Sequence, residues 1–312
     1  MLRPADNLST YPTINAGTGT LGLIGHPAGH SLSPAIHNAA FEALGMNFRY
    51  LAWDVEPHRL GDAVAGARAL GFAGLNVTIP YKESVVRWLD ELSPSARNAG
   101  AVNVIENKNG HLTGHNTDGA GFLRSLALDL TFDPAGKTVL ILGAGGAARA
   151  LAAALLAAGV GRLTLANRSV NRARDIMDVL SRTLPAGGAM TAVDLCSEPL
   201  MRSVLTQCDL VINCTPVGMY PAIGFSPLAN VRDLPKHCLV ADTIFNPRRT
   251  NFMALAEARG LRTIGGQGML VQQAALAWEI WFARPGPVDT MTRALDQALG
   301  VNKDPETLPR EE

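Results

Sequence analysis

The chain has 312 residues, of which 47% are hydrophobic and 17% are charged, and it contains 31 glycines. This length predicts two domains, and the composition is typical of a compact α/β enzyme rather than a disordered chain. The formal net charge is zero. The basic surplus of a nucleic-acid-binding protein is therefore absent, and no nucleic-acid partner is predicted. No apolar run reaches the roughly 18 residues of a membrane-spanning helix, so no membrane association is predicted either.

The N-terminal and cysteine patterns favour a cytoplasmic protein without a metal site. Residues 1–20 lack the apolar core of a signal peptide, and we expect a poorly ordered extension there. The cysteines form neither a C-x-x-C pair nor a metal-ligand spacing with histidine. They are Cys196, Cys208, Cys214 and Cys238. Reduced thiols are the prediction, and for assembly a monomer and a homodimer both stay open.

Short apolar and alternating runs predict strands and helices that alternate through the first part of the chain. Strands are expected at 21–25, 48–55, 74–79, 102–106 and 111–114, and helices at 33–44, 57–70 and 84–92. Ser33 is the expected N-cap of the first helix, with Pro34 as its first residue and Gly45 at its end. Asn109-Gly110 is typical of a hairpin turn. The β-α-β-α-β order predicts a small mixed sheet.

The rest of the chain repeats the strand–helix pattern more regularly. Strands are expected at 138–142, 162–166, 191–194, 210–213 and 239–242, and helices at 118–130, 145–158, 172–182, 251–259, 269–282 and 288–300. Residues 138–142 form a continuous apolar run, which is typical of a strand buried on both faces of a parallel sheet. The tail from 301 to 312 is charged and contains proline, and we expect it to be frayed.

A glycine-rich turn, Gly143-Ala144-Gly145-Gly146-Ala147-Ala148, lies directly after that apolar run and directly before a predicted helix. In such a G-x-G-x-x-A turn, Gly143 permits the tight turn, Gly145 lets a pyrophosphate approach the backbone, and Ala148 lets the helix pack closely. The helix N-terminus then offers free N–H groups to phosphates. A turn used only for packing is the alternative. The strand before it, the helix after it and a further strand about 20 residues on favour a dinucleotide site.

The residues after that further strand favour NADP over NAD. An NAD site usually presents Asp or Glu to the ribose hydroxyls at this point. This chain has Asn167-Arg168-Ser169, followed by Arg172. No carboxylate in this stretch would repel a 2′-phosphate, and two guanidiniums and a hydroxyl are available to bind one. The alternative is that both arginines merely line the solvated start of a helix.

Three short polar runs stand at predicted strand ends or helix starts, where the ligand-binding residues of α/β folds gather. They are His30-Ser31-Leu32-Ser33-Pro34, Asn76-Val77-Thr78-Ile79-Pro80-Tyr81-Lys82 and Asn116-Thr117-Asp118-Gly119. Single residues have structural explanations, because Ser33 and Asp118 suit N-caps and Lys82 suits a solvated surface. Their co-occurrence favours a site for a hydroxylated acid. Together with the glycine-rich turn, they predict hydride transfer to or from a small polar substrate.

The order of these motifs resembles the shikimate dehydrogenase family over residues 21–298. The matching segments are Gly25-x-Pro27-x-x-His30-Ser31-x-Ser33-Pro34-x-x-His37-Asn38, Asn76-Val77-Thr78-x-Pro80-x-Lys82, Gly100-Ala101-Val102-Asn103, Gly114-x-Asn116-Thr117-Asp118-Gly119, the glycine-rich turn, Asn167-Arg168-Ser169, Asn213-Cys214-Thr215-Pro216-Val217-Gly218-Met219 and Gly268-Met269-Leu270-Val271-Gln272-Gln273. The resemblance implies a cytoplasmic oxidoreductase of chorismate and aromatic amino acid biosynthesis. It would interconvert 3-dehydroshikimate and shikimate with NADP.

The resemblance also implies the domain organisation. Residues 1–117 would form a substrate-binding catalytic domain with a mixed sheet, and residues 118–264 a Rossmann-like NADP-binding domain. Residues 265–312 would form C-terminal helices that return to pack on the substrate domain.

The family roles pass to matching positions of the substrate site. The hydroxyls of Ser31 and Ser33 would bind the substrate carboxylate. Amide, hydroxyl and carboxylate groups would contact the ring hydroxyls, and they belong to Asn76, Thr78, Asn103, Asp118 and Gln273. Lys82 would be the general acid/base, and Asp118 would contact the same hydroxyl and hold Lys82, since a lysine partly desolvated beside a carboxylate can exchange a proton near neutral pH. The reverse assignment stays open because the two groups form a coupled pair.

The cofactor residues follow from the turn and from the family in the same way. The expected NADP contacts are Gly143, Ala144, Gly145, Gly146, Ala147, Asn167, Arg168, Ser169, Arg172, Thr215, Val217, Gly218, Gly266 and Met269. Asn213 would join Thr215, Val217 and Gly218 beside the nicotinamide, and Met269 would pack near its ring.

One position departs from the family pattern and bears on the substrate. The family often has tyrosine where Asp242-Thr243-Ile244-Phe245 has phenylalanine. Loss of that hydroxyl predicts weaker substrate binding or a different substrate, because a hydrogen bond to a charged group contributes about 1.5–3 kcal/mol. A shikimate/quinate dehydrogenase that uses NAD is the alternative within the class. A non-catalytic NADP-binding sensor of shikimate is the alternative from another class, and it has no need of the Lys82–Asp118 pair.

Overall fold

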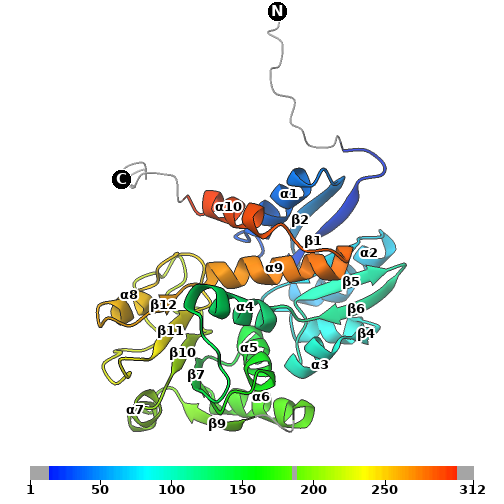
Figure 1. The fold of residues 1–312 in the computed structure, drawn as a ribbon. Coiled ribbons are helices and arrows are strands. Elements are labelled where there is room, and N and C mark those ends of the chain that lie inside the picture. Colours follow the sequence, from blue (N-terminus) through cyan, green and yellow to red (C-terminus); the bar gives the residue numbers. More distant parts are fainter. Residues whose placement is uncertain (1–13, 185–187, 301–312) are drawn as a thin grey trace, which may run out of the picture.

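The computed structural model describes residues 14–184 and 188–300, and its helices and strands build two α/β halves, each around its own sheet (Figure 1). The predicted tail at 301–312 and most of the predicted N-terminal extension lie outside the described residues. The first strand begins at Gly19, two residues earlier than the sequence predicted.

The first half contains a mixed six-stranded sheet in the order β2-β1-β3-β5-β6-β4. Its strands are β1 (Gly19–Gly25), β2 (Phe48–Asp54), β3 (Gly74–Val77), β4 (Glu91–Leu92), β5 (Val104–Lys108) and β6 (His111–His115). Strand β1 pairs in parallel with β2 and β3, whereas β5 pairs antiparallel with β3 and β6. The carboxyl ends of β1 and β3 therefore lie side by side, and the polar runs that follow them meet at one edge.

Five helical segments belong to this half. They are α1 (Ser33–Ala43), α2 (Leu60–Ala69), α3 (Pro94–Ala99) and the short 3₁₀ helices η1 (Pro57–Arg59) and η2 (Ser84–Trp88). The predicted helix at 84–92 is wrong, because η2 ends in extended backbone at Leu89 and the next residues pair with β6. Ser33 is not the N-cap of α1, since that position falls to Leu32 without a side-chain bond and Ser33 is the first helical residue.

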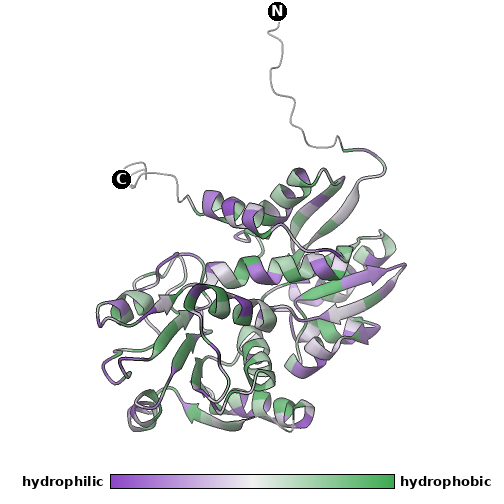
Figure 2. Ribbon diagram, viewed as in Figure 1, coloured by the Kyte–Doolittle hydropathy of each residue, from purple (hydrophilic) through white to green (hydrophobic). Residues whose placement is uncertain are grey.

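The second half contains a parallel six-stranded sheet in the order β12-β11-β10-β7-β8-β9. Its strands are β7 (Thr138–Leu142), β8 (Arg162–Asn167), β9 (Ala189–Asp194), β10 (Leu210–Asn213), β11 (Leu239–Asp242) and β12 (Thr263–Ile264). If β7 is numbered 1 and β12 is numbered 6, the order read from β9 is 3-2-1-4-5-6, which is the strand order of the Rossmann dinucleotide-binding fold. Figure 2 shows hydrophobic residues along these strands, as a sheet covered on both faces requires. The predicted fold class is confirmed.

Helices flank the second sheet and link it to the first half. They are α4 (Asp118–Leu130), α5 (Gly146–Ala157), α6 (Val170–Thr183), α7 (Glu198–Leu205), α8 (Asn251–Glu257), α9 (Gly266–Phe282) and α10 (Val288–Ala298). In α6, Ala173, Ile176 and Leu180 are buried at helical spacing, so one stripe faces the sheet and the rest faces water. Helices α3 and α7 and strand β12 are elements that the sequence analysis did not predict.

The last two helices share a core with the first sheet. Helix α9 crosses the middle of the molecule beside α4, and α10 lies against α1 (Figure 1). Trp278 of α9 and Met291 of α10 are fully buried in one cluster with Leu21, Ile36 and Phe41. The domain boundaries at residues 117 and 264 stay a prediction.

Candidate active site

The centre of the site is an ion pair between Lys82, in the loop after β3, and Asp118, in the first turn of α4. The Lys82 Nζ atom lies 2.5 Å from Asp118 Oδ2, and the two side chains are 16% and 5% exposed. Asp118 stands at a helix N-terminus, where the helix dipole stabilises a negative charge. The pair is therefore largely shielded from water, and its interaction is screened less than that of a surface pair.

Asn103 connects this pair to three neighbouring groups. Its Nδ2 atom donates to Asp118 Oδ1 and to Thr117 Oγ1, each at 2.9 Å, and lies 3.3 Å from Gln273 Oε1. Its Oδ1 atom accepts a bond from the backbone N–H of Thr117 at 2.8 Å. Asn103, Asp118 and Gln273 come from three separated parts of the chain, and the structure brings all three together as predicted substrate residues.

Asn76 extends the same network toward α1. Its Nδ2 atom donates to the backbone oxygen of Asn103 at 3.1 Å. Its Oδ1 atom accepts a bond of 2.6 Å from the hydroxyl of Tyr50, and the Ser33 side chain is near enough to lower the pKa of that hydroxyl, although burial raises it more. Ser31 lies beside Ser33, whose backbone N–H donates to Ser31 Oγ at 3.3 Å.

Thr78 stands at the carboxyl end of β3, opposite the carboxyl end of β1. Its backbone N–H donates to the oxygen of Ile24 at 3.0 Å, and its side chain faces Gly25. The end of β1 and the loop after β3 are therefore held against one another beside the predicted substrate residues.

The glycine-rich turn joins β7 to α5 as the motif predicts. Gly143 has a φ of +108°, a backbone conformation that other residues rarely adopt. Gly145 is the N-cap of α5 and offers no side chain to the first turn, so the first N–H groups of that helix are left for another acceptor. An added Cβ at Gly145 would meet nothing within 4 Å, which leaves room for a ligand to approach the backbone.

The turn also contacts the ion pair of Lys82 and Asp118. A Cβ added at Gly146 would lie 3.2 Å from Cβ and 3.3 Å from Cδ of Lys82. The start of the dinucleotide helix thus packs against the stem of Lys82. The residues predicted to bind cofactor and those predicted to transfer a proton therefore meet at one junction between the two halves.

The loop after β10 lies against the glycine-rich turn, because a Cβ added at Gly143 would lie 3.0 Å from the backbone oxygen of Cys214. Asn213 is fully buried, and its Oδ1 atom accepts bonds from the backbone N–H and the hydroxyl of Thr215 at 2.9 and 2.7 Å. Its Nδ2 atom lies 3.3 Å from the oxygen of Val217. The N–H of Gly266 donates to Ile244 at 2.9 Å, so α9 begins at the same edge of the sheet.

The carboxylate of Asp242, at the end of β11, accepts hydrogen bonds from the end of β10 and from the segment that follows β11. Its Oδ1 atom accepts a bond of 3.1 Å from Asn213, and its Oδ2 atom accepts one of 2.8 Å from Thr250. Burial raises the pKa of Asp242 to about 6, although hydrogen bonds from Ile244, Thr250 and Asn213 lower it. Three residues further along, Phe245 is half-buried and its backbone oxygen accepts a bond from Gln267.

The predicted phosphate-binding arginines follow β8, next to β7 in the sheet. Arg168 and Arg172 are exposed, and among the described residues neither forms an ion pair. Asn167 turns back to donate to the oxygen of Ser169 at 2.9 Å. Both guanidiniums are thus free to bind an anion at this edge.

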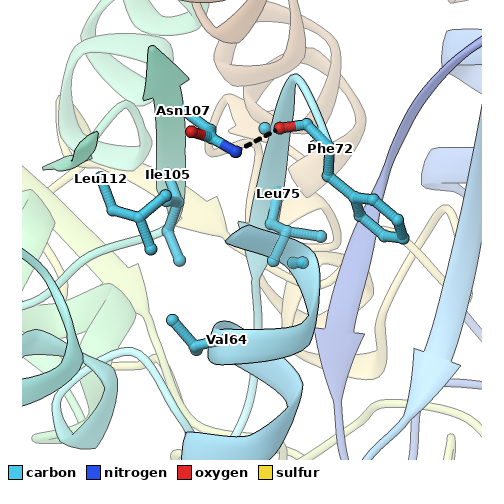
Figure 3. A pocket seen from close by; sticks show the side chains of 8 residues that line it. Val64, Phe72, Leu75, Ile105, Asn107 and Leu112 are labelled. Carbon is cyan, nitrogen blue, oxygen red and sulfur yellow. Dashed lines mark hydrogen bonds between the residues drawn. The ribbon is translucent and has the colours of Figure 1, made fainter. Parts of the chain in front are cut away.

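The cavity in Figure 3 is separate from this site. It lies in the core of the first half, among Val64, Ala67, Phe72, Gly74, Leu75, Ile105, Asn107 and Leu112. Its volume is about 10 Å³, which is room for about one water molecule. Asn107, its polar member, already donates to the oxygen of Phe72 at 2.8 Å. This cavity is a packing gap and not a substrate pocket.

Over residues 14–184 and 188–300, no group of three or more His, Cys, Asp or Glu side chains is placed to hold a metal ion. All four cysteines are free thiols, and burial raises the pKa of the Cys214 thiol beside the site. None of the helices in the same stretch of chain is both long and apolar enough to cross a bilayer.

Sequence reasoning missed four residues that the structure places at the site: Tyr50, Thr117, Glu83 and Arg149. Thr117 lies within one of the polar runs, yet only its bonds to Asn103 reveal its part. Glu83 Oε2 lies 3.2 Å from Arg149 Nη2 and connects the loop of Lys82 to α5. Nothing in the local sequence of Tyr50 distinguishes it from an ordinary strand tyrosine.

The fold and the site define a Rossmann-type α/β protein with a lysine–carboxylate pair beside its dinucleotide turn. Residues 23–105 match the family model "Shikimate dehydrogenase substrate binding domain", residues 125–220 match "Shikimate / quinate 5-dehydrogenase" and residues 266–295 match "Shikimate 5'-dehydrogenase C-terminal domain". A curated relative from Symbiobacterium thermophilum, "Shikimate dehydrogenase (NADP(+))", is 50% identical over 89% of this chain and 94% of its own length. The chain therefore belongs to the shikimate dehydrogenase family.

Solved structures agree with this assignment. A shikimate dehydrogenase in complex with NADP+ is 37% identical, with a TM-score of 0.84 over 92% of this chain and 98% of the other. A quinate dehydrogenase from Corynebacterium glutamicum in complex with NAD is 34% identical, with a TM-score of 0.81 over 90% and 99%. The fold alone therefore does not separate the two substrates or the two cofactors.

Proposed function

We propose that this protein is an NADP-dependent enzyme that reversibly reduces 3-dehydroshikimate to shikimate. The observation that carries the proposal is the contact between Gly146 of the dinucleotide turn and the stem of Lys82, whose amine is paired with Asp118. A cofactor bound on that turn would lie beside a proton-transfer pair. Hydride transfer between a carbonyl and an alcohol needs both groups at one place.

The residues present fit NADP. The glycine-rich turn leaves open space at Gly145 and free N–H groups at the start of α5, which suits a pyrophosphate. Arg168 and Arg172 are exposed, and neither is paired with a carboxylate in residues 14–184 or 188–300, which suits a 2′-phosphate. Thr215, Val217, Gly218, Gly266 and Met269 would border the nicotinamide. When bound, NADP supplies or accepts the hydride.

The chain's own part in the reaction is to move the proton. In the direction of reduction, the Lys82 ammonium would donate a proton to the substrate oxygen as that oxygen becomes an alcohol. In the direction of oxidation, the neutral amine would take the proton back. Asp118 would stabilise the ammonium and accept a hydrogen bond from the same hydroxyl, while Asn103 holds its other oxygen in place.

The substrate would lie between α1 and the network around Asn103. Ser31 and Ser33 would donate to its carboxylate, and Asn76, Thr78, Asn103 and Gln273 would contact the ring hydroxyls. The bonds among Asn76, Asn103 and Gln273 support this arrangement, because they orient the amides before a ligand arrives. Oxidised cytoplasmic disulfides are rare, and four free thiols fit the cytoplasm as the site of action.

The deciding experiment is a matrix of shikimate and quinate against NADP⁺ and NAD⁺ with the purified protein, followed at 340 nm. The expected result is the highest kcat/KM with shikimate and NADP⁺. Higher kcat/KM with quinate and NAD⁺ would establish the alternative dehydrogenase. Binding of NADP and shikimate without turnover would establish the sensor, and light scattering of the same sample distinguishes monomer from homodimer.

A further inference from the structure

Tyr50 of β2 contacts Asn76, one of the proposed substrate residues. Its side chain is fully buried. Its hydroxyl donates to Asn76 Oδ1 at 2.6 Å, and the Ser33 side chain is near enough to lower the pKa of this hydroxyl, although burial raises it more. The Tyr50 hydroxyl is therefore bonded to a proposed substrate residue on β3.

The position of Tyr50 is fixed by an aromatic platform. The His37 ring stacks on it with 4.4 Å between the centroids and 14° between the planes. His37 Nδ1 in turn accepts a bond of 2.9 Å from Trp278 Nε1 on α9. Burial lowers the pKa of His37 to about 3, so its ring is neutral at working pH and its hydrogen is on Nε2.

The Tyr50 hydroxyl acts as a steady donor in this setting. Burial raises the pKa of Tyr50 well above its ordinary value, so the hydroxyl keeps its hydrogen over the working pH range. Neither the tyrosine nor the histidine beneath it changes charge there. The two rings therefore hold the hydroxyl in one place, and neither ring gains or loses a proton over this pH range.

Both ends of the Asn76 amide are hydrogen-bonded. Tyr50 donates to its oxygen, and its nitrogen donates to the backbone oxygen of Asn103. After a half-turn of the amide, its oxygen would face the backbone oxygen of Asn103, and its NH₂ group would face the Tyr50 hydroxyl, which would have to accept a bond and lose the one that it donates. The bonds at both ends therefore favour the observed orientation, which leaves one amide hydrogen and one oxygen lone pair for a ligand.

We infer that Tyr50 is a positioning residue for substrate recognition, which acts by fixing the orientation of the Asn76 amide through its hydroxyl. This inference rests on the proposed function, since it needs Asn76 to contact a ring hydroxyl. The alternative is that Tyr50 only fills the core between α1, α9 and the first sheet.

The test is Tyr50→Phe, which keeps the ring and its stack and removes the hydroxyl. The expected result is a KM for shikimate about fivefold to tenfold higher, as the loss of one buried hydrogen bond predicts, with an unchanged KM for NADP⁺. In an Asn76→Ala background the same change should alter the KM for shikimate less than twofold, because the amide it orients is gone.

The matched control is Trp281→Phe. Trp281 packs on the same tyrosine and histidine, and its Nε1 atom donates to the backbone oxygen of Ile105, outside the site. It should lower the Tm while leaving the KM for shikimate within twofold. If Tyr50→Phe leaves that KM unchanged, or raises it by the same factor in both backgrounds, the inference is overturned. Absence of shikimate turnover by the unmodified protein would instead refute the proposed function.

Discussion

In the proposed mechanism, the chemistry depends most on Lys82. It is held by one carboxylate and packed along its stem by the dinucleotide turn, so its amine has a defined place. Lys82→Ala removes the proton donor and should lower kcat for shikimate oxidation by about 10²-fold or more, with a smaller change in KM. Steady-state kinetics measure this effect. Lys236→Ala, at an exposed lysine far along the sequence, is the control. A Lys82→Ala variant with unaltered kcat would leave Asp118 as the proton-transfer residue.

Arg168 decides the choice of nicotinamide in this proposal. It is exposed and forms no ion pair with any residue that the structure describes, so it offers a positive charge at the end of β8. Arg168→Asp replaces that charge with a carboxylate, which repels a 2′-phosphate and can accept bonds from ribose hydroxyls. The kcat/KM for NADP⁺ should fall about tenfold or more relative to that for NAD⁺. An unchanged ratio would show that other groups bind the phosphate.

Phe245 is the position where the family resemblance led us to expect a tyrosine. The side chain is half-buried in the loop after β11, close to the start of α9. Phe245→Tyr adds a hydroxyl that can donate to a charged substrate group, and the KM for shikimate should fall about tenfold if the pocket is built for shikimate. An unchanged KM for shikimate together with a lower KM for quinate would favour the other substrate.

At the level of elements, apolar periodicity correctly predicted the helices and strands that depend mainly on local sequence. Strand β7, the glycine-rich turn and α5 follow from a continuous apolar run and a turn motif, and they form as expected. The segment 84–92 failed because pairing of Glu91–Leu92 with β6 overrides its helical spacing. Helices α3 and α7 have 6 and 8 residues, which is shorter than the window of about 11–18 residues in which apolar periodicity is read. The bond between His37 and Trp278 was not predicted because these residues lie 241 positions apart in sequence, a separation that no local pattern reports.

The buried carboxylate of Asp242 lies at the ends of β10 and β11. Its burial lowers the stability of the folded protein once the carboxylate is ionised. Asp242 has a folded pKa of about 6 against an ordinary value of 3.8. Between about pH 4 and pH 6 the unfolded chain loses this proton while the folded protein keeps it, so stability falls as the pH rises through this window. A difference of about two pH units corresponds to about 3 kcal/mol as an upper bound.

Asp242→Asn keeps the shape and its bonds from Asn213 and Ile244 but removes the titration. Measured relative to the unmodified protein, the Tm of this variant should therefore rise between pH 4 and pH 7. Other groups, including His37, titrate equally in both proteins and cancel in the difference. Thermal melts across that range test the expectation. Parallel Tm curves for the two proteins would contradict the burial cost assigned to Asp242.

At the scale of the whole molecule, the two halves are joined beside the reacting pair by the bond between Glu83 and Arg149. The Arg149 side chain is 14% exposed, and among the described residues Glu83 is the one carboxylate that pairs with its guanidinium. The Nε atom of the same guanidinium is buried and has no hydrogen-bond partner among those residues. Glu83 directly follows Lys82, and Arg149 lies in the first turns of α5, close to Gly146. The ion pair therefore holds the loop of Lys82 against α5, at the place where the proposed function puts hydride and proton transfer.

Glu83→Gln removes this charge while keeping the side chain's size. Because Glu83 is 42% exposed, solvent screens part of the interaction, and the cost in stability should be about 1 kcal/mol, which is a Tm lower by a few degrees. The larger effect should fall on catalysis, with kcat reduced about threefold to tenfold because Lys82 loses a fixed position against α5. The comparison is Asp62→Asn, which breaks the exposed pair with Arg59 and should change neither quantity measurably. If both variants lower the Tm equally and leave kcat intact, the alignment of the two halves is set by the packing of α4 against α5 and α9, and not by this bond.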